Sequence, residues 1–217
     1  MASEPLILAF DTSAAHCAAA LLSGDRCLAQ RSEAMQGGQA ERLFPLLEEL
    51  LAEAGVAWRD LAALGVGTGP GSFTGVRVAV AAARGLALSL GVPAVGVSGF
   101  DALGAEGPRP LLASLDARRG ACFLKRLDAG AAPPVAATPE ALPAAWRGSG
   151  LPVVGHAADA VAAATGGPVL TPRWPLAEAI ARIAATRRAR PQPRPAPVYL
   201  RPADAAPPSD PPPVLLP

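Results

Sequence analysis

The stretch Gly67–Arg77, with the sequence GTGPGSFTGVR, decides how this chain folds, because a glycine-rich turn leads directly into an apolar segment. Glycine lacks a Cβ atom, so the turn permits positive φ values and close approach of another backbone. The preceding Leu64–Val66 has the apolar character of a short buried strand, and Ser72 or Thr74 is placed to cap a following helix. The pattern predicts a strand, a turn and a helix, with the structural turn formed by Gly69, Pro70, Gly71, Ser72 and Gly75.

A helix that begins after a glycine turn is also a common phosphate site, since free N–H groups and the helix dipole converge there. The usual signatures of such a site are absent from this sequence. A Walker A loop requires GxxxxGK[ST], but the only lysine is Lys125, and Thr74 stands at the third glycine position of GxGxxG. We therefore favour a structural role, in which the turn lets a helix and a sheet pack closely. A phosphate-binding role is the less favoured interpretation.

The composition is that of a globular chain of 217 residues, enough for one large domain or two small ones. Hydrophobic residues make up 51% of the sequence, but the apolar runs are interrupted before the roughly 18 residues that a membrane span requires. No signal-peptide pattern opens the chain, and its three cysteines (17, 27 and 122) form no CxxC pair. We expect a cytoplasmic protein with no membrane contact. Its net charge of +1 provides no general field for nucleic acid.

Two segments have the periodicity of helices. In Gln39–Ala54 the leucines recur at spacings of three and four, and Thr74–Leu90 is apolar around nearly its whole circumference. A helix of the second kind needs cover on all sides, which neighbouring helices of the same chain or another protein can supply. We predict that the two helices form an association surface through Leu43, Leu47, Leu50, Leu51, Val76, Arg77, Val80, Ala83, Arg84 and Ala87.

The beginning of the chain is similar to its middle. A shift of 105 positions places LLASLDARRGACFLKRL (Leu111–Leu127) on LILAFDTSAAHCAAALL (Leu6–Leu22) and aligns an aspartate, a cysteine and a leucine of each. Each segment has the pattern of a strand, an aspartate-led turn and a second strand. The order of elements predicts an α/β protein built from two βββαβα domains, the second of them degenerate.

The first of these domains is expected over residues 1–105 and the second over 106–201. The second should contain a short strand at Val153–Val154, a helix over Leu176–Arg190 and a last strand at Val198–Leu200. Proline dominates residues 202–217, which we expect to form a disordered tail.

Few residues have the spacing of a catalytic or metal site. Asp11, Thr12 and Ser13 form either a vestigial phosphate hairpin or, as we favour, a turn that bonds to its own backbone. His16 and His156 have no HxxxH or HExxH partner, and His16 is expected at a turn or on the surface. Ser72 lacks the GxSxG pattern of a nucleophile. The sequence therefore predicts no catalytic residue and no bound metal.

Several motifs together resemble one family. They are ILAFDTS (Ile7–Ser13), ERLFPLLEELL (Glu41–Leu51), GTGPGSFTGVRVAVAAARGLAL (Gly67–Leu88), SLDARRG (Ser114–Gly120) and PVYLR (Pro197–Arg201). In this order they resemble the TsaB family, also called YeaZ, over most of the chain. The resemblance implies a duplicated actin-like, Hsp70-like (ASKHA, ribonuclease H-like) fold. It also implies a role in making threonylcarbamoyladenosine (t6A) at position 37 of tRNA.

In that family the protein resembles an inactive paralogue of the transferase TsaD, which it supports by dimerising through its two N-terminal helices, while the ATPase TsaE joins the complex. The metal-binding histidines of the family belong to TsaD. Where many relatives carry a His-Ser/Thr pair, this chain has Gln39 and Ala40, which strengthens the interpretation as a scaffold. The resemblance implies no cofactor beyond weak ATP or ADP binding in the complex, and contact with tRNA only through the complex.

Two alternatives stay open at the level of sequence. One is a small ASKHA-fold ATPase or kinase, or a peptidase-like enzyme, that uses Asp11, Asp116 and the glycine turn. The other is a homodimer that uses the same two helices on itself when TsaD is absent.

Overall fold

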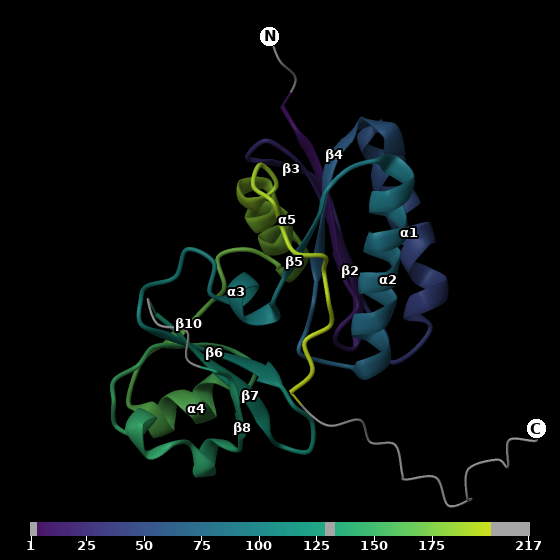
Figure 1. The fold of residues 1–217 in the computed structure, drawn as a ribbon. Helices are drawn as coiled ribbons and strands as arrows, with labels where there is room; N and C mark the ends of the chain where they lie inside the picture. The colour runs from purple at the N-terminus through teal and green to yellow at the C-terminus, as the bar shows by residue number, and fades with distance from the viewer. Residues whose placement is uncertain (1–3, 129–132, 201–217) are drawn as a thin grey trace, which may run out of the picture.

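The computed structural model describes residues 4–128 and 133–200, which form two five-stranded sheets with helices on their faces (Figure 1). The first sheet has the order β3-β2-β1-β4-β5, and β2 is antiparallel to both of its neighbours while β4 is parallel to β1 and β5. Its strands are β1 (Leu6–Asp11), β2 (His16–Ser23), β3 (Arg26–Ala34), β4 (Leu61–Gly67) and β5 (Ala94–Val97).

Three helices cover this sheet. Helices α1 (Gln39–Ala54) and α2 (Phe73–Leu90) lie side by side on one face, and α5 (Leu176–Arg187) lies on the other (Figure 1). The α1 bounds agree with the predicted ones, and Pro45 lies inside the helix without ending it. Helix α2 begins after Ser72, whose side chain accepts a hydrogen bond from the Gly75 backbone N–H, as the capping argument predicts.

The second sheet repeats the topology of the first. Its order is β10-β9-β6-β7-β8, with β7 antiparallel to β6 and β8 and with β9 parallel to β6 and β10, which matches the first sheet strand for strand. Its strands are β6 (Leu111–Asp116), β7 (Cys122–Leu127), β8 (Val135–Ala137), β9 (Val153–Gly155) and β10 (Val169–Leu170). This repetition confirms the duplicated actin-like fold.

The second half is also degenerate, as predicted. Two 3₁₀ turns, Pro139–Ala141 and Ala144–Trp146, stand between β8 and β9, where the first half has α1. The sequence analysis missed helix α4 (Ala158–Thr165), because a segment composed mostly of alanine has little periodic pattern.

The two halves exchange their last helices. Helix α3 (Gly99–Leu103) belongs to the first half, but its Phe100 is buried with Leu111, Ala113 and Phe123 of the second sheet. In return, α5 of the second half buries Ile180 against Ile7 and Ala9 of β1. Each half of the chain therefore completes the core of the other, and the boundary near residue 105 stays a prediction.

Two expectations about detail are wrong. Val198–Leu200 is not a strand, although the Val198 N–H donates to the Thr68 carbonyl oxygen at 2.9 Å. The three identities of the 105-residue shift are also not all structurally equivalent, since Asp11 lies opposite Ala18 whereas Asp116 lies opposite Cys122. The second hairpin turn is one residue shorter. The proline-rich segment 202–217 lies outside the described residues.

Candidate functional site

The glycine turn packs against the hairpin that joins β1 to β2. The Thr12 hydroxyl donates to the Gly75 carbonyl oxygen at 2.6 Å, and the Ser72 N–H donates to the Ser13 carbonyl oxygen at 2.6 Å. A Cβ atom on Gly71 would overlap the Ser13 carbonyl, and one on Gly75 would overlap the Thr12 carbonyl. These contacts support a packing role for the turn, because glycine is needed wherever the two backbones meet.

Two earlier residues of this turn, Gly67 and Gly69, also support a packing role. Gly69 has φ of 81°, which favours glycine, and the Gly69–Pro70 peptide bond is cis. A Cβ atom on Gly67 would overlap the Asp11 carboxylate, because Asp11 ends the neighbouring strand β1. The turn, the hairpin and the start of α2 therefore form one close-packed junction.

Asp11 is the centre of a buried polar cluster in this junction. Its side chain is 2% exposed, and Oδ1 accepts hydrogen bonds from the Ser13 N–H and hydroxyl, both at 2.9 Å. The same oxygen lies 2.7 Å from His16 Nε2. Thr12 is fully buried and Ser13 nearly so, with both hydroxyls bonded inside the chain. This arrangement supports a structural turn at Asp11–Ser13 rather than an open phosphate hairpin.

The structure corrects the predicted location of His16. It is the first residue of β2, and its ring is bonded to Asp11 across the hairpin instead of lying free at a turn. The signal that could have identified the pair is the hairpin itself, because a strand ending at residue 11 and one starting at residue 16 place these two side chains close together.

The cluster does not have the geometry of a hydrolytic triad. In a triad the histidine lies between the serine and the aspartate and removes the serine proton. Here the Ser13 hydroxyl and the His16 ring both bond to the Asp11 carboxylate, so no base faces the hydroxyl. Asp116 has separate partners, because its Oδ1 accepts from the Arg118 N–H at 2.6 Å and lies 3.7 Å from His156 Nε2.

A cavity of about 400 Å³ adjoins the same junction. It is bounded by the β1–β2 hairpin, residues 36–41 and the first turn of α2, and Arg118 lines it from the second half. Among residues 4–128 and 133–200, no group of three His, Cys, Asp or Glu side chains is placed to hold a metal ion. The prediction that the protein binds no metal stays a prediction.

The predicted association surface needs correction. Seven of its residues are buried in the core between α1, α2 and the first sheet, where another protein cannot contact them. They are Leu43, Leu47, Leu50, Leu51, Val76, Val80 and Ala83. Apolar periodicity predicts which side chains are buried, but it does not say what covers them. Here the first sheet of the same chain covers them. Arg77 and Arg84 are exposed, and the half-buried Ala87 packs against the edge of this core.

The opposite faces of the two helices are open. Phe44 of α1 and Phe73 of α2 are each 42% exposed, and Leu88 near the end of α2 is 82% exposed. Ala81 is exposed, and a Cβ atom on Gly85 would meet nothing within 4 Å. We call this surface, made by Phe44, Phe73, Ala81, Gly85 and Leu88, the outer helical face.

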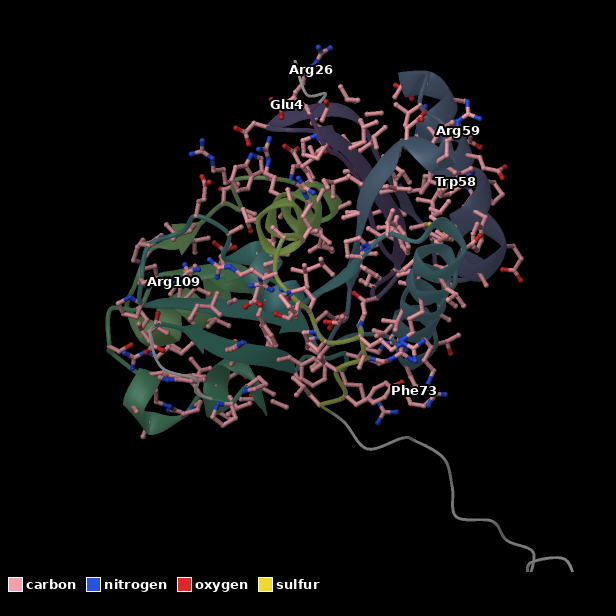
Figure 2. All side chains as sticks on the ribbon, turned by 45° about the horizontal axis from the view of Figure 1, so that its top comes forward. Glu4, Arg26, Trp58, Arg59, Phe73 and Arg109 are labelled. Carbon is pink, nitrogen blue, oxygen red and sulfur yellow. The ribbon has the colours of Figure 1, made fainter. Side chains whose placement is uncertain are left out.

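The segment after α5 borders the outer helical face. It runs down between α2 and the second sheet (Figure 1). The Arg77 guanidinium lies 3.6 Å from the centre of the Phe73 ring and donates to the Tyr199 hydroxyl at 2.8 Å. Phe73 is the first residue of α2 (labelled in Figure 2), and its ring also lies 5.1 Å from that of Tyr199. Arg77 and Arg84, predicted as interface residues, thus hold the chain's own C-terminal segment, since Arg84 Nε donates to the Pro195 carbonyl oxygen at 2.7 Å.

Helix α2 is the one helix of the described residues that is long and apolar enough, by length and composition alone, to cross a membrane. Arg77 and Arg84 interrupt its apolar run, as the sequence analysis states. Its inner side packs in the core through Val76, Ala79 and Val80, and its two arginines bond to the C-terminal segment. Core helices of soluble proteins have the same composition, so the length criterion is weak support for a span.

Comparison with known proteins extends these observations. The model of the family described as TsaD, tRNA N6-adenosine threonylcarbamoyltransferase, matches residues 33–182. YeaZ from Pseudomonas aeruginosa is 30% identical in sequence, with a TM-score of 0.71 over 90% of this chain and all of that one. The chain belongs to the TsaB (YeaZ) family. A second solved structure from that organism, an uncharacterized protein with similarity to peptidase YeaZ, has a TM-score of 0.73 and the same identity.

Curated relatives of the TsaB family match about half of this chain. The tRNA threonylcarbamoyladenosine biosynthesis protein TsaB of Escherichia coli strain K12 is 37% identical over 122 residues, which are 54% of this chain and 52% of that protein. The TsaB of Bacillus subtilis strain 168 is 38% identical over 120 residues, with the same coverage. The chain thus spans about half the length of the curated relatives it matches.

Proposed function

We propose that this chain is a non-catalytic subunit required for t6A modification of tRNA, and that it acts by dimerising with a TsaD-like transferase. The names of its TsaB relatives place them in threonylcarbamoyladenosine biosynthesis. The single observation that carries the scaffold role is the outer helical face, where Leu88 is 82% exposed on a helix whose composition calls for burial.

The outer helical face has the properties of a helix-packing surface. Ala81 and Gly85 of α2 are one helical turn apart and both exposed, so a partner helix can approach the α2 backbone closely. Phe73, Leu88 and Phe44 are the large exposed apolar side chains of the same two helices. Exposed apolar side chains favour association over solvation, because a partner that covers them removes apolar area from water.

Electrostatics add a preference for the partner. Glu41 and Glu48 are exposed on α1, whereas Glu53 is paired with Arg31, and Arg42 is bonded to both Glu33 and Glu49. The outer side of α1 is therefore acidic, and a partner with basic residues beside its apolar contact would be selected. A second copy of this chain would oppose acidic α1 helices, so a heterodimer is preferred over a homodimer.

The interpretation as a non-catalytic subunit rests on the Asp11 cluster. The Asp11 carboxylate is buried and bonded to Ser13 and His16, and Asp116 is exposed with other partners. A phosphate-transfer site would require a lysine or a metal ion near the aspartates. The only lysine, Lys125, lies 3.8 Å from Asp101 instead. We infer no cofactor for the isolated chain, with weak ATP binding confined to a complex that also contains a TsaE-like ATPase.

A small ASKHA-fold ATPase is the alternative, and the cavity of about 400 Å³ beside the α2 N-terminus is the observation that favours it. Direct titration of the chain with ATP and ADP separates the two functions. Tight nucleotide binding or ATP hydrolysis by the isolated chain would contradict the scaffold role.

The scaffold role is tested by placing a charge on the outer helical face. Ala81→Glu and Leu88→Glu each put a carboxylate in the proposed contact and should leave the chain folded, because both positions are exposed. Ala163→Glu, on the exposed side of α4, is the matched control. Light scattering of each variant mixed with the TsaD-like transferase measures the complex, and t6A formation with TsaE, tRNA, ATP and threonylcarbamoyl-adenylate measures its activity.

We expect the two outer-face variants to lose the complex and the modification, while Ala163→Glu keeps both. A complex that survives both Ala81→Glu and Leu88→Glu would refute this interface. Modification of tRNA by the chain without a transferase would refute the non-catalytic role.

A further inference from the structure

A second surface feature lies apart from the Asp11 cluster and shares Leu88 with the outer helical face. Ala81 does not line it, so Ala81→Glu is the variant that tests the outer helical face alone. A groove of about 580 Å³ runs between the C-terminal part of α2, the start of β5 and the chain that follows α5. Four arginines line it, and none of its lining residues is acidic or aromatic. We call it the arginine groove, and its arginines are Arg84, Arg188, Arg190 and Arg194.

The positive charge of this groove is not neutralised by the part of the chain that the structure describes. Arg190 and Arg194 are exposed and Arg188 is half-buried, and none of the three takes part in an ion pair between described residues. The neighbouring Arg187 is different, since it lies 3.7 Å from Asp101. Because the net charge of the whole chain is only +1, this groove is a local concentration of positive charge.

The groove is also held in shape before any ligand arrives. Pro195 is buried against Gly96 of β5, and its carbonyl oxygen accepts the hydrogen bond from Arg84. Pro191 and Pro193 restrict the backbone that carries Arg190 and Arg194. A preformed wall reduces the entropy lost when the arginines bind a ligand.

We propose that the arginine groove binds the phosphate backbone of an RNA, which under the proposed function is the tRNA substrate. Guanidinium groups bind phosphate oxygens through paired hydrogen bonds. The absence of aromatic residues from the lining argues against stacked bases, so the contact is to the backbone and independent of base sequence. The identification of the RNA as tRNA rests on the proposed function. The binding of phosphate rests on the arginine groove alone.

Helix geometry explains only part of this cluster. Arg188 caps the C-terminus of α5, where a positive charge complements the helix dipole. Arg190 and Arg194 follow the helix, and Arg84 comes from α2, so the dipole does not account for their position in one groove. These residues are therefore the ones to change.

The test compares two double variants that alter the net charge equally. Arg190→Gln/Arg194→Gln removes two positive charges from the groove, whereas Arg26→Gln/Arg59→Gln removes two exposed ones that do not line it (labelled in Figure 2). Each protein is titrated into a fluorescent tRNA transcript at 50, 100 and 200 mM KCl, both alone and in complex with the transferase. Binding to the transferase is measured in parallel without tRNA.

We expect the groove variant to lose affinity for tRNA on the order of tenfold at the lowest salt. The slope of the logarithm of the binding constant against the logarithm of the KCl concentration should become shallower by about 2, because two phosphate contacts are lost. The Arg26/Arg59 variant should bind tRNA like the parent chain. Equal tRNA binding by both variants would overturn the proposal. So would a groove variant that keeps tRNA and loses the transferase, because the groove would then hold an acidic protein segment. A failure of the parent complex to form would refute the scaffold role alone, since the isolated chain still reports on the groove.

Discussion

Gly75→Ala and Gly85→Ala place the same methyl group at two positions of α2 and should change stability in opposite directions. Gly75 is buried in the first turn of the helix, where a Cβ atom would overlap the Thr12 carbonyl oxygen and lie 3.0 Å from its carbon. The backbones cannot both keep their positions, so the start of α2 must move away from the β1–β2 hairpin. Forced overpacking costs about 1–3 kcal/mol. Weakening the hydrogen bond from the Thr12 hydroxyl to the Gly75 carbonyl costs about 1 kcal/mol more.

Gly85 is the matched control in the same helix. It is exposed, and an added Cβ atom would meet nothing within 4 Å, so the only effect is the higher helix propensity of alanine. That gain is about 1 kcal/mol. For a chain of this size 1 kcal/mol changes the melting temperature by about 2–4 °C.

Urea unfolding followed by circular dichroism measures both changes. We expect the free energy of unfolding to fall by about 2–4 kcal/mol for Gly75→Ala and to rise by up to about 1 kcal/mol for Gly85→Ala. If Gly75→Ala is as stable as the parent chain, the close approach of turn and hairpin is not what requires glycine there. Gly85→Ala should also weaken the complex with the transferase if a helix packs closely on the outer helical face.

Three further changes test the core, the Asp11 cluster and a buried thiol. Val80→Glu should unfold the chain, because a buried, unpaired carboxylate costs about 3–5 kcal/mol; a folded Val80→Glu monomer by circular dichroism would show that Val80 is not core. Asp11→Ala leaves the Ser13 and His16 donors without their acceptor and should lower the free energy of unfolding by about 2–3 kcal/mol. The rate of t6A formation should fall only in proportion to the loss of folded protein. A variant that is stably folded but inactive would instead indicate that Asp11 is catalytic. Burial, with a smaller effect of nearby Glu33, raises the pKa of the Cys17 thiol to about 11, so the folded chain retains a proton that the unfolded chain loses above pH 9. The free energy of unfolding should therefore fall by about 2–3 kcal/mol between pH 9 and 11, and an identical fall in Cys17→Ala would exclude this thiol as the cause.

The sequence predicted those elements whose local pattern is strong. The leucine stripe of α1 and the glycines beside it define a helix over Gln39–Ala54, as the structure has it. The glycine turn and Ser72 define the start of α2 to within one residue. These predictions succeed because periodicity, capping and glycine conformation depend on residues a few positions apart. Helix α4 was missed because alanine carries little of that information.

The sequence by itself also determined the duplication, the TsaB motifs and the fact that α2 is too apolar to face water on all sides. Only the tertiary structure decided which side of α2 is covered, because Val80 and Leu88 have the same apolar chemistry and differ only in what packs on them. It also paired His16 with Asp11 and brought Arg84 beside Arg188, Arg190 and Arg194 from more than a hundred positions away. The physical reason is that burial, pairing and local charge are set by distances in space, which a linear pattern specifies only within one helix or hairpin.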